Sequence, residues 1–144
     1  MNMVQPTYDD VTLILRLYEL RREDKMREAR DWFVKNFKPK SMEDFAKIAA
    51  PGTQENAYFR QVTSYWEMVS SFITSGVLNK ELYFQSGMEL LLCWIRVRHI
   101  APALRQGQNN PKVWRNMESV ASDMIEWLNH DNPGAYDAFV ARVG

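Results

Sequence analysis

The sequence has few of the side chains that build metal, disulfide or nucleophilic sites. It contains one cysteine, Cys93, and two histidines, His99 and His130, which stand far apart in the 144-residue chain. This set lacks the ligand spacing of a zinc site and cannot form an internal disulfide, and the apolar neighbours of Cys93 indicate a buried, unreactive thiol. Gly-rich phosphate loops and the Gly-x-Ser-x-Gly elbow are also absent. We therefore predict a protein without a metal site, a cofactor or a catalytic residue, which is not an enzyme.

A net charge of either sign is absent as well. The chain carries 18 basic and 18 acidic residues, so it has no overall field to attract a polyanion, and we expect no nucleic-acid partner. Its uninterrupted apolar runs are only a handful of residues long, whereas a membrane span needs about 20. The first twenty residues include acids and an arginine and do not resemble a signal peptide. We therefore expect no membrane span in this chain and a location in the reducing cytoplasm.

Apolar residues at helical spacing are what the sequence has in quantity. They make up 46% of the chain, and the strand-like alternation of apolar and polar residues is nearly absent. The length is that of one ordinary domain. We predict a single all-α domain over residues 1–144. It should be an antiparallel bundle of five to seven helices, because the connections between the long central helices are short.

Thr7 and Asp10 have the spacing of a capping box, so the first helix should begin there. One apolar stripe then continues at the helical period, and we expect it to face the core. The stripe comprises Val11, Leu15, Tyr18, Met26, Ala29, Phe33 and Phe37. Arg22 interrupts it. The charged run at 21–30 is either the solvated middle of one helix or a bend between two, and we favour a break or kink near residues 22–24.

Two hydroxyl residues mark the next helix starts. Ser41 should cap a short helix that ends at residue 49 or 50, and Thr53 should cap a long helix that ends at Gly76. The long helix carries a second apolar stripe, which we also expect to face the core. This stripe comprises Phe59, Val62, Trp66, Val69 and Ile73.

The second half of the chain predicts three further helices. Asn79 should cap a helix that continues past Gly87 and ends or kinks near residue 100, because Pro102 cannot continue it. The dipeptide at 110–111 suits the cap and first turn of another helix. A last short helix should begin at residue 132 or 133.

Glu67 stands at the edge of the second stripe, and its role can be weighed from its surroundings. A buried carboxylate must be paired, because an isolated one would take up a proton instead. Arg98 takes a core-facing position on the following helix and is the predicted partner, with Arg105 as the second choice. We favour a structural ion pair over a general acid, because no second carboxylate or nucleophile accompanies Glu67.

The charges are segregated along the second half of the chain. Every charged residue between Leu90 and Met117 is basic, and acids dominate the remainder of the chain. One interpretation is that the two segments neutralise each other, or that acids of the first helix neutralise the bases. The other is a shallow site for phosphate or another small anion within residues 96–115. The candidate ligand-binding residues are Arg96, Arg98, His99 and Arg105. His99 itself is either a boundary histidine bonded to a carbonyl or a ligand-binding, pH-sensitive group.

The order of these features resembles an uncharacterised bacterial family of all-helical proteins, a domain of unknown function. The resemblance extends over roughly residues 10 to 128. It rests on the segments Glu28 to Arg30, Tyr65 to Glu67 and Gly76 to Leu82, and on Trp94, Pro102 and Arg105. Many members of that family begin with a membrane-spanning helix, and this sequence departs from them there. The resemblance implies an all-helical fold and no particular activity.

These features support two hypotheses of function. The preferred one is a noncatalytic helical bundle of unknown role that takes part in protein–protein interaction, scaffolding or regulation, with an unknown protein partner or as a homodimer formed through a surplus aromatic face. The alternative is a domain that binds or senses a small anionic ligand or a nucleotide through the basic segment 96–115. Because a ligand specific to the native state must stabilise it, a ligand-stabilisation screen separates the two.

Overall fold

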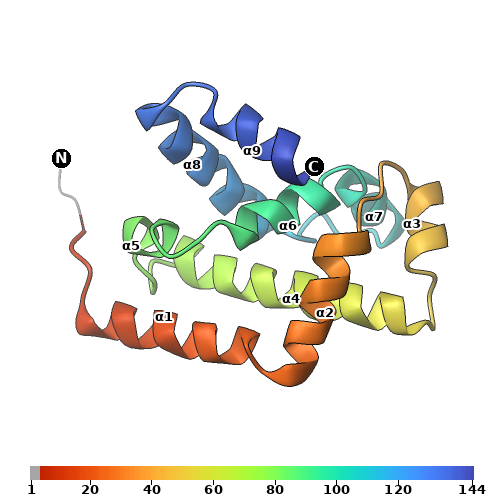
Figure 1. Ribbon diagram of the computed structural model, residues 1–144, viewed down its shortest axis with the longest axis horizontal. Helices are drawn as coiled ribbons and strands as arrows, with labels where there is room; N and C mark the ends of the chain where they lie inside the picture. The colour runs from red at the N-terminus through yellow and green to blue at the C-terminus, as the bar shows by residue number, and fades with distance from the viewer. Residues whose placement is uncertain (1–3) are drawn as a thin grey trace.

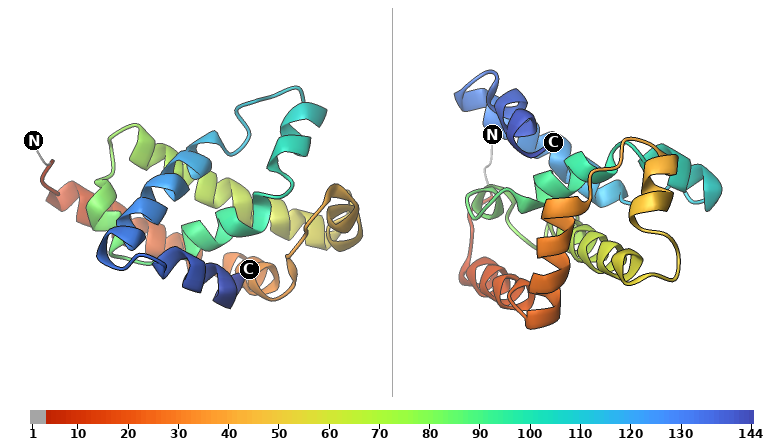
Figure 2. Two further views of the ribbon diagram at one scale, coloured as in Figure 1. Left: turned by 90° about the horizontal axis from the view of Figure 1, so that it is seen from above. Right: turned by 45° about the vertical axis from the view of Figure 1, so that its right-hand side comes forward.

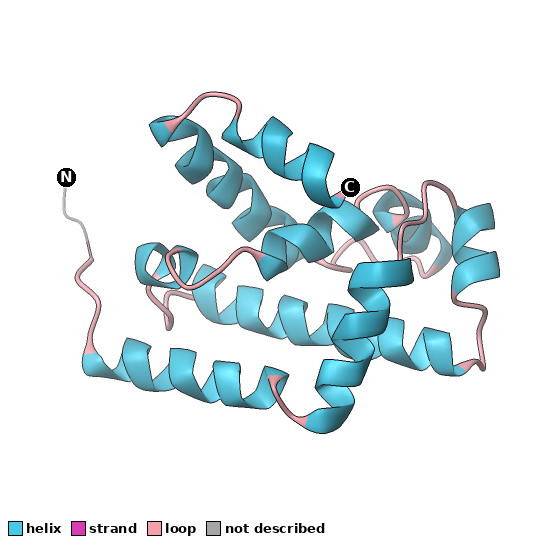
Figure 3. Ribbon diagram, in the orientation of Figure 1, coloured by secondary structure: helices cyan, strands magenta, loops and turns pink. Residues whose placement is uncertain are grey.

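The computed structural model describes residues 4–144, and these residues form nine helices and no strand (Figure 1, Figure 3). The predicted all-α class is confirmed, with more helices than the five to seven expected. The helices are α1 Tyr8–Arg21, α2 Asp24–Asn36, α3 Met42–Ile48, α4 Gln54–Thr74, α5 Lys80–Phe84, α6 Glu89–Val97, α7 Ala101–Gly107, α8 Arg115–Asp131 and α9 Ala135–Val143. None of these helices is long and apolar enough to cross a membrane.

Helix α4 is the centre of the fold (Figure 1, Figure 2). It packs against α2, α6 and α8, and α8 in turn packs against α6 and α9. Helix α1 lies along one edge of the molecule, and α9 lies at the opposite edge (Figure 1). The first and last helices, α1 and α9, are therefore packed against fewer neighbouring helices than α4 is.

The predicted helix starts in the first half of the chain are confirmed. Thr7 and Asp10 form a capping box at α1, and the hydroxyls of Ser41 and Thr53 accept backbone N–H bonds at α3 and α4. The predicted break near residues 22–24 is also present. There the Glu23 carboxylate accepts a 3.1 Å bond from the backbone N–H of Met26 and opens α2.

Two predictions in the second half of the chain are wrong. The helix capped by Asn79 does not continue through Gly87, because that residue has a φ of 153° and separates α5 from α6. Likewise, α8 begins at Arg115 and not at residues 110–111. The Asn110 side chain accepts a 2.9 Å bond from the backbone N–H of Lys112 and so holds the chain in a turn before the helix.

The core is built around the apolar stripe of α4, which is buried along its whole length as predicted. Four phenylalanines from α2, α3 and α4 or their ends meet beside it. Phe37 stacks on Phe33 at 4.8 Å between ring centroids and on Phe59 at 5.1 Å, and Phe45 meets Phe59 edge-on at 4.8 Å. Cys93 is fully buried here, and burial raises the pKa of its thiol, so the thiol remains protonated and unreactive.

Candidate functional site

Arg96, a predicted ligand-binding residue, is buried and ties helix ends together. Its Nη1 donates to the backbone carbonyls of Phe33, Val34 and Phe37 at 3.0 to 3.1 Å, and its Nε donates to Val143 O at 2.8 Å. These carbonyls lie at the C-terminal ends of α2 and α9, where the helix dipole is negative. Burial lowers the pKa of Arg96, and these helix ends supply the compensating negative potential. The positive charge of Arg96 is therefore balanced by backbone carbonyls inside the fold.

The other predicted ligand residues point to different places. The Nη1 of Arg98 donates to the Tyr136 hydroxyl of α9 at 2.7 Å. Arg105 donates to Val113 O at 2.9 Å and forms a 2.9 Å ion pair with Glu118 of α8. The second contact joins the basic segment to the acidic segment, in the way that mutual neutralisation predicts.

His99 is exposed, and it lies in the turn between α6 and α7 instead of on a helix. Partial desolvation, together with the positive charges of Arg98 and Lys40, lowers the pKa of His99. None of the four predicted ligand-binding residues lines the cavity of about 830 Å³ beside α5 or the cavity of about 870 Å³ beside α3. Arg96, Arg98 and Arg105 make separate contacts, and the role of the four residues as an anion site stays a prediction.

The predicted ion pair between Glu67 and Arg98 is wrong. Glu67 instead caps α8: its carboxylate accepts bonds from Met117 N at 2.8 Å, Asn116 Nδ2 at 2.9 Å and Asn116 N at 3.3 Å. A carboxylate favours a helix N-terminus because the first backbone N–H groups there lack partners within the helix. The residue before α8, Trp114, has no side-chain cap to offer. Glu67 therefore fills a place that the local sequence leaves empty.

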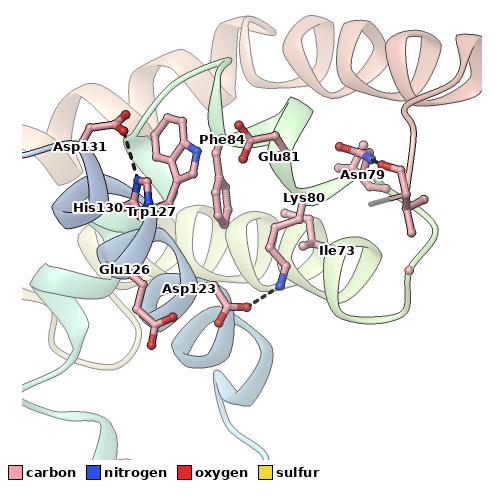
Figure 4. Close-up of a pocket in the computed structure, with 13 residues that line it drawn as sticks. Ile73, Asn79, Lys80, Glu81, Phe84, Asp123, Glu126, Trp127, His130 and Asp131 are labelled. Atoms are coloured by element: carbon pink, nitrogen blue, oxygen red, sulfur yellow. Dashed lines mark hydrogen bonds and ion pairs between the residues drawn. The ribbon is translucent and has the colours of Figure 1, made fainter. Parts of the chain in front are cut away.

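One cavity lies between α5, α8 and the C-terminal end of α4 (Figure 4). It has a volume of about 830 Å³, and its wall includes Phe84 and Trp127, whose ring centroids are 5.5 Å apart. Four carboxylates surround it. Asp123 forms a 2.8 Å ion pair with Lys80, and Asp131 lies 3.3 Å from Nδ1 of His130, a contact that is an ion pair when the imidazole is protonated. The unpaired acids are Glu81 and Glu126, counting ion pairs among residues 4–144.

We call this cavity the aromatic-acidic cleft, and the sequence predictions missed it. The residues that α8 contributes to the cleft are spaced three or four apart in sequence, so they share one face of the helix. This spacing was the signal that could have predicted the cleft; the residues are Asp123, Glu126, Trp127 and His130. Within the described part of the chain, no three histidine, cysteine or acidic side chains are close enough to hold a metal ion. A wall of this kind can contact a cationic or aromatic group.

A second cavity, the apolar groove, lies between α3, α4, α7 and the turn before α8. It has a volume of about 870 Å³, and its apolar wall includes Phe45, Phe59, Leu104 and Trp114. Trp114 has a φ of 53° and a ψ of 27°, a left-handed conformation that is strained for a bulky residue. Edge-on packing against Phe59 at 5.8 Å stabilises it there. The groove can take an apolar side chain or ligand.

The outer face of α1 is the largest departure from the predicted burial. Val11, Leu15 and Tyr18 were expected in the core but are 43%, 56% and 43% exposed, and Tyr8 is 90% exposed. Leu17 is buried in their place, with Leu13 and Ile14 half-buried beside it. We call Tyr8, Val11, Leu15 and Tyr18 the α1 stripe. Helix α1 is therefore apolar on two sides, and the fold covers one of them.

Two arginines that follow the α1 stripe in sequence make cation–π contacts with Tyr18, the last residue of the stripe. The guanidinium groups of Arg21 and Arg22 lie 5.1 and 5.3 Å from the centroid of the Tyr18 ring, in the range of cation–π contacts. Arg21 is itself fixed by a 3.2 Å ion pair with Glu89 of α6, which also pairs with Arg30 at 3.0 Å. The two guanidinium groups therefore hold the exposed ring of Tyr18 in place.

The comparisons with known proteins give one match. A family model described as a domain of unknown function (DUF4760) matches residues 6–127. No curated protein and no solved structure matches the chain. The matched residues include the α1 stripe, the apolar groove and most of the aromatic-acidic cleft.

Proposed function

The chain belongs to the DUF4760 family of domains of unknown function, and we propose that this member is a noncatalytic module that binds a protein partner along the outer face of α1. The family assignment agrees with the predicted resemblance to a helical family without an assigned activity. It leaves the role to be argued from the surface. The cytoplasmic location expected from the sequence stays part of this proposal.

The α1 stripe is the observation that carries the proposal. Its four members are spaced three, four and three residues apart, the a and d spacing by which one helix packs along another. A helix that is apolar on both sides is normally covered on both sides. Covering each of these side chains with a partner contributes about 1 to 2 kcal/mol. A partner helix laid along α1 therefore matches both the pattern and the exposure.

The alternative, a small anionic ligand at the basic segment, has less support. Arg96 is occupied by four backbone carbonyls, and Arg105 by Glu118 and Val113. An anion would have to displace these contacts before it could bind either arginine. The preferred function needs no such rearrangement, because the α1 stripe is already exposed.

Site-specific crosslinking tests the proposal. A photo-crosslinking amino acid is placed at Leu15 and, as the matched control, at Ser119, an exposed position on α8. Each protein is irradiated in an extract of the source cells, and adducts are resolved by mass. We expect a discrete protein adduct from position 15 that is absent from position 119 and is lost when Tyr18→Lys is added. The same adducts from both positions, or none from position 15, would contradict the proposal.

A further inference from the structure

We propose that the apolar groove is a binding site for a long-chain carboxylate, the chemistry of a fatty acid. The groove lies between α3, α4, α7 and the turn before α8, and it shares no residue with the α1 stripe. The inference therefore goes beyond the proposed function and does not depend on it. It rests on the size and wall of the groove, on the position of its polar groups, and on two cations that have no acidic partner.

The groove has the size and the wall of a small-molecule pocket. Its volume of about 870 Å³ falls within the range of about 300 to 1,000 Å³ that is typical of such pockets. Phe45, Phe59 and Trp114 are buried residues that form its floor, and Leu104 of α7 extends this floor. Because the burial of apolar surface has no directional requirement, a flexible alkyl chain can follow the floor.

The side of α4 that faces the groove separates apolar from polar groups. The residues that it contributes follow the helical period between residues 56 and 67, so they share one side of the helix. Phe59 and Thr63 are buried there, and the Thr63 hydroxyl already donates to Phe59 O at 2.9 Å. Arg60 and Ser64 are exposed one turn apart and form a polar edge beside the buried floor. A ligand with an apolar chain and one polar end matches this division.

Two cations line the groove without an acidic partner. Within residues 4–144, neither Arg60 of α4 nor Lys112 of the turn forms an ion pair. The Nε of Arg60 donates to Asn56 Oδ1 at 3.0 Å, and neither of its Nη groups donates to another atom of the described residues. Glu67 also lines the groove, but its carboxylate already accepts bonds from the backbone of Met117 and Asn116.

Charge complementarity identifies the head group of the ligand. The charge that is left on the wall is positive, so it attracts an anionic head and repels a cationic one. The planar fork of an arginine pairs with a carboxylate through two parallel N–H bonds, and the Nη groups of Arg60 are available for such a pair. A carboxylate on an apolar chain therefore matches both the edge and the floor of the groove.

The backbone of Trp114 marks the same place. Its φ of 53° and ψ of 27° are strained for a bulky residue, and strained residues of this kind concentrate at ligand-binding and active sites. The Trp114 side chain does not cap α8; its ring lines the groove and packs edge-on against Phe59 at 5.8 Å. The strained conformation thus places a large aromatic surface in the wall, where an alkyl chain can pack against it.

Isothermal titration calorimetry of the purified chain with dodecanoate, below its critical micelle concentration, tests the inference. We expect one saturable site with a dissociation constant of about 0.1 mM. Decanoate, which is two methylene groups shorter, should bind about tenfold more weakly, because each buried methylene contributes to affinity. Dodecyltrimethylammonium has the same chain with a cationic head and should bind at least about tenfold more weakly. No saturable binding of dodecanoate below about 1 mM, or equal affinity for the two head groups, overturns the inference.

Two variants locate the site. Ala46 is an exposed residue of α3 that lines the groove, so Ala46→Trp fills the groove without replacing a buried residue. Arg60→Glu replaces the pairing cation with an acid. Each variant should weaken dodecanoate binding at least about tenfold, with an unchanged circular dichroism spectrum. Lys25→Glu, the matched control, makes the same kind of charge reversal at an exposed position of α2 outside the groove and should leave the affinity unchanged. The inference fails if either variant binds dodecanoate as tightly as the wild-type chain does, or if Lys25→Glu weakens binding as much as Arg60→Glu.

A protein segment is the competing occupant of the groove. A discrete protein adduct from a photo-crosslinking amino acid at Ala46, together with no binding of dodecanoate, would make the groove a protein site and would overturn the inference. Crosslinking from position 15 of α1 does not depend on the groove. A failed dodecanoate titration therefore removes this inference alone, and a missing adduct from position 15 removes the proposed function alone.

Discussion

Helices α1 and α4 carry apolar stripes of the same kind, but the stripe of α4 is buried and the stripe of α1 is exposed. The five stripe residues of α4 are all buried, whereas Val11, Leu15 and Tyr18 of α1 are exposed. Helix α4 has α2, α6 and α8 around it, and α1 lies at the edge of the fold with its second apolar side against the core (Figure 1). Helical periodicity thus tells which residues share a face. It does not tell what covers that face.

The largest effect should come from a charge placed in the stripe of α4. Val69 is fully buried, so Val69→Lys places an ammonium group in the core without a partner and should cost at least about 4 kcal/mol. Because this variant is expected to unfold, Val69→Ala provides a measurable companion, with an expected loss of about 2 kcal/mol in urea denaturation. A folded Val69→Lys protein with wild-type stability would show that α4 is not the centre of the core.

Much of the first half of the fold could be predicted because its signals are local. Thr7, Ser41 and Thr53 act within three residues of themselves, and the periodic stripe of α4 has five members between residues 59 and 73. The break before α2 could be predicted from a run of charges for the same reason. The start of α8 could not, because a turn held by Asn110 and a cap supplied by Glu67 decide it together.

The contacts of Arg96 and Glu67 were beyond prediction for a related reason. Arg96 binds carbonyls about 60 and 47 residues away in sequence, and Glu67 binds N–H groups about 50 residues away. Backbone groups have no side-chain signature, so a search for opposite charges paired Glu67 with an arginine instead. The α1 stripe was misplaced because two apolar sides compete on one helix, and the chosen one happened to face outward.

The second largest effect should come from removing Arg96, which joins α6 to the C-terminal ends of α2 and α9. Arg96→Met keeps the apolar stem but leaves the C-terminal carbonyls of α2 and α9 without a donor, and we expect a loss of about 3 kcal/mol. Arg96→Lys keeps the charge but cannot reach four acceptors with one ammonium group, so its loss should be smaller. The measurement is the free energy of unfolding in urea. Equal stability of all three proteins would contradict the bridging role.

The cap that Glu67 of α4 provides to α8 should contribute less to the free energy of unfolding than Arg96 does. Glu67→Ala removes the acceptor for the N–H of Met117 and the side-chain amide of Asn116, and we expect a loss of about 2 kcal/mol. Glu67→Gln keeps one acceptor oxygen but loses the favourable charge at the helix N-terminus, and it should cost about 1 kcal/mol. Urea denaturation orders the three proteins. If Glu67→Gln is as damaging as Glu67→Ala, the charge matters more than the hydrogen bonds.

The contacts on the inner side of α1 should make the stability of the fold depend on pH in the acid range. Asp10 accepts bonds from Thr7 N at 2.7 Å and Asn79 N at 2.8 Å, and these bonds, Thr7 first, lower the pKa of Asp10. A lowered pKa means that the unfolded chain binds the proton more readily, so this stability is complete above about pH 4 and is lost as the pH falls further. Asp10→Asn should flatten the acid limb of stability measured between about pH 2 and pH 4. If the acid limb is unchanged in Asp10→Asn, other carboxylates cause the loss of stability at low pH.

The smallest effect should come from the outer side of α1, and it is the matched opposite of Val69→Lys. Leu15 is 56% exposed in the single chain, so Leu15→Lys removes little buried surface and leaves the ammonium group in water. We expect the free energy of unfolding to change by less than about 0.5 kcal/mol when the purified chain is denatured in urea. The same substitution should abolish binding of the proposed protein partner. A loss of several kcal/mol in the purified chain would mean that Leu15 belongs to the core after all, and that α1 and α4 differ less than their exposures indicate.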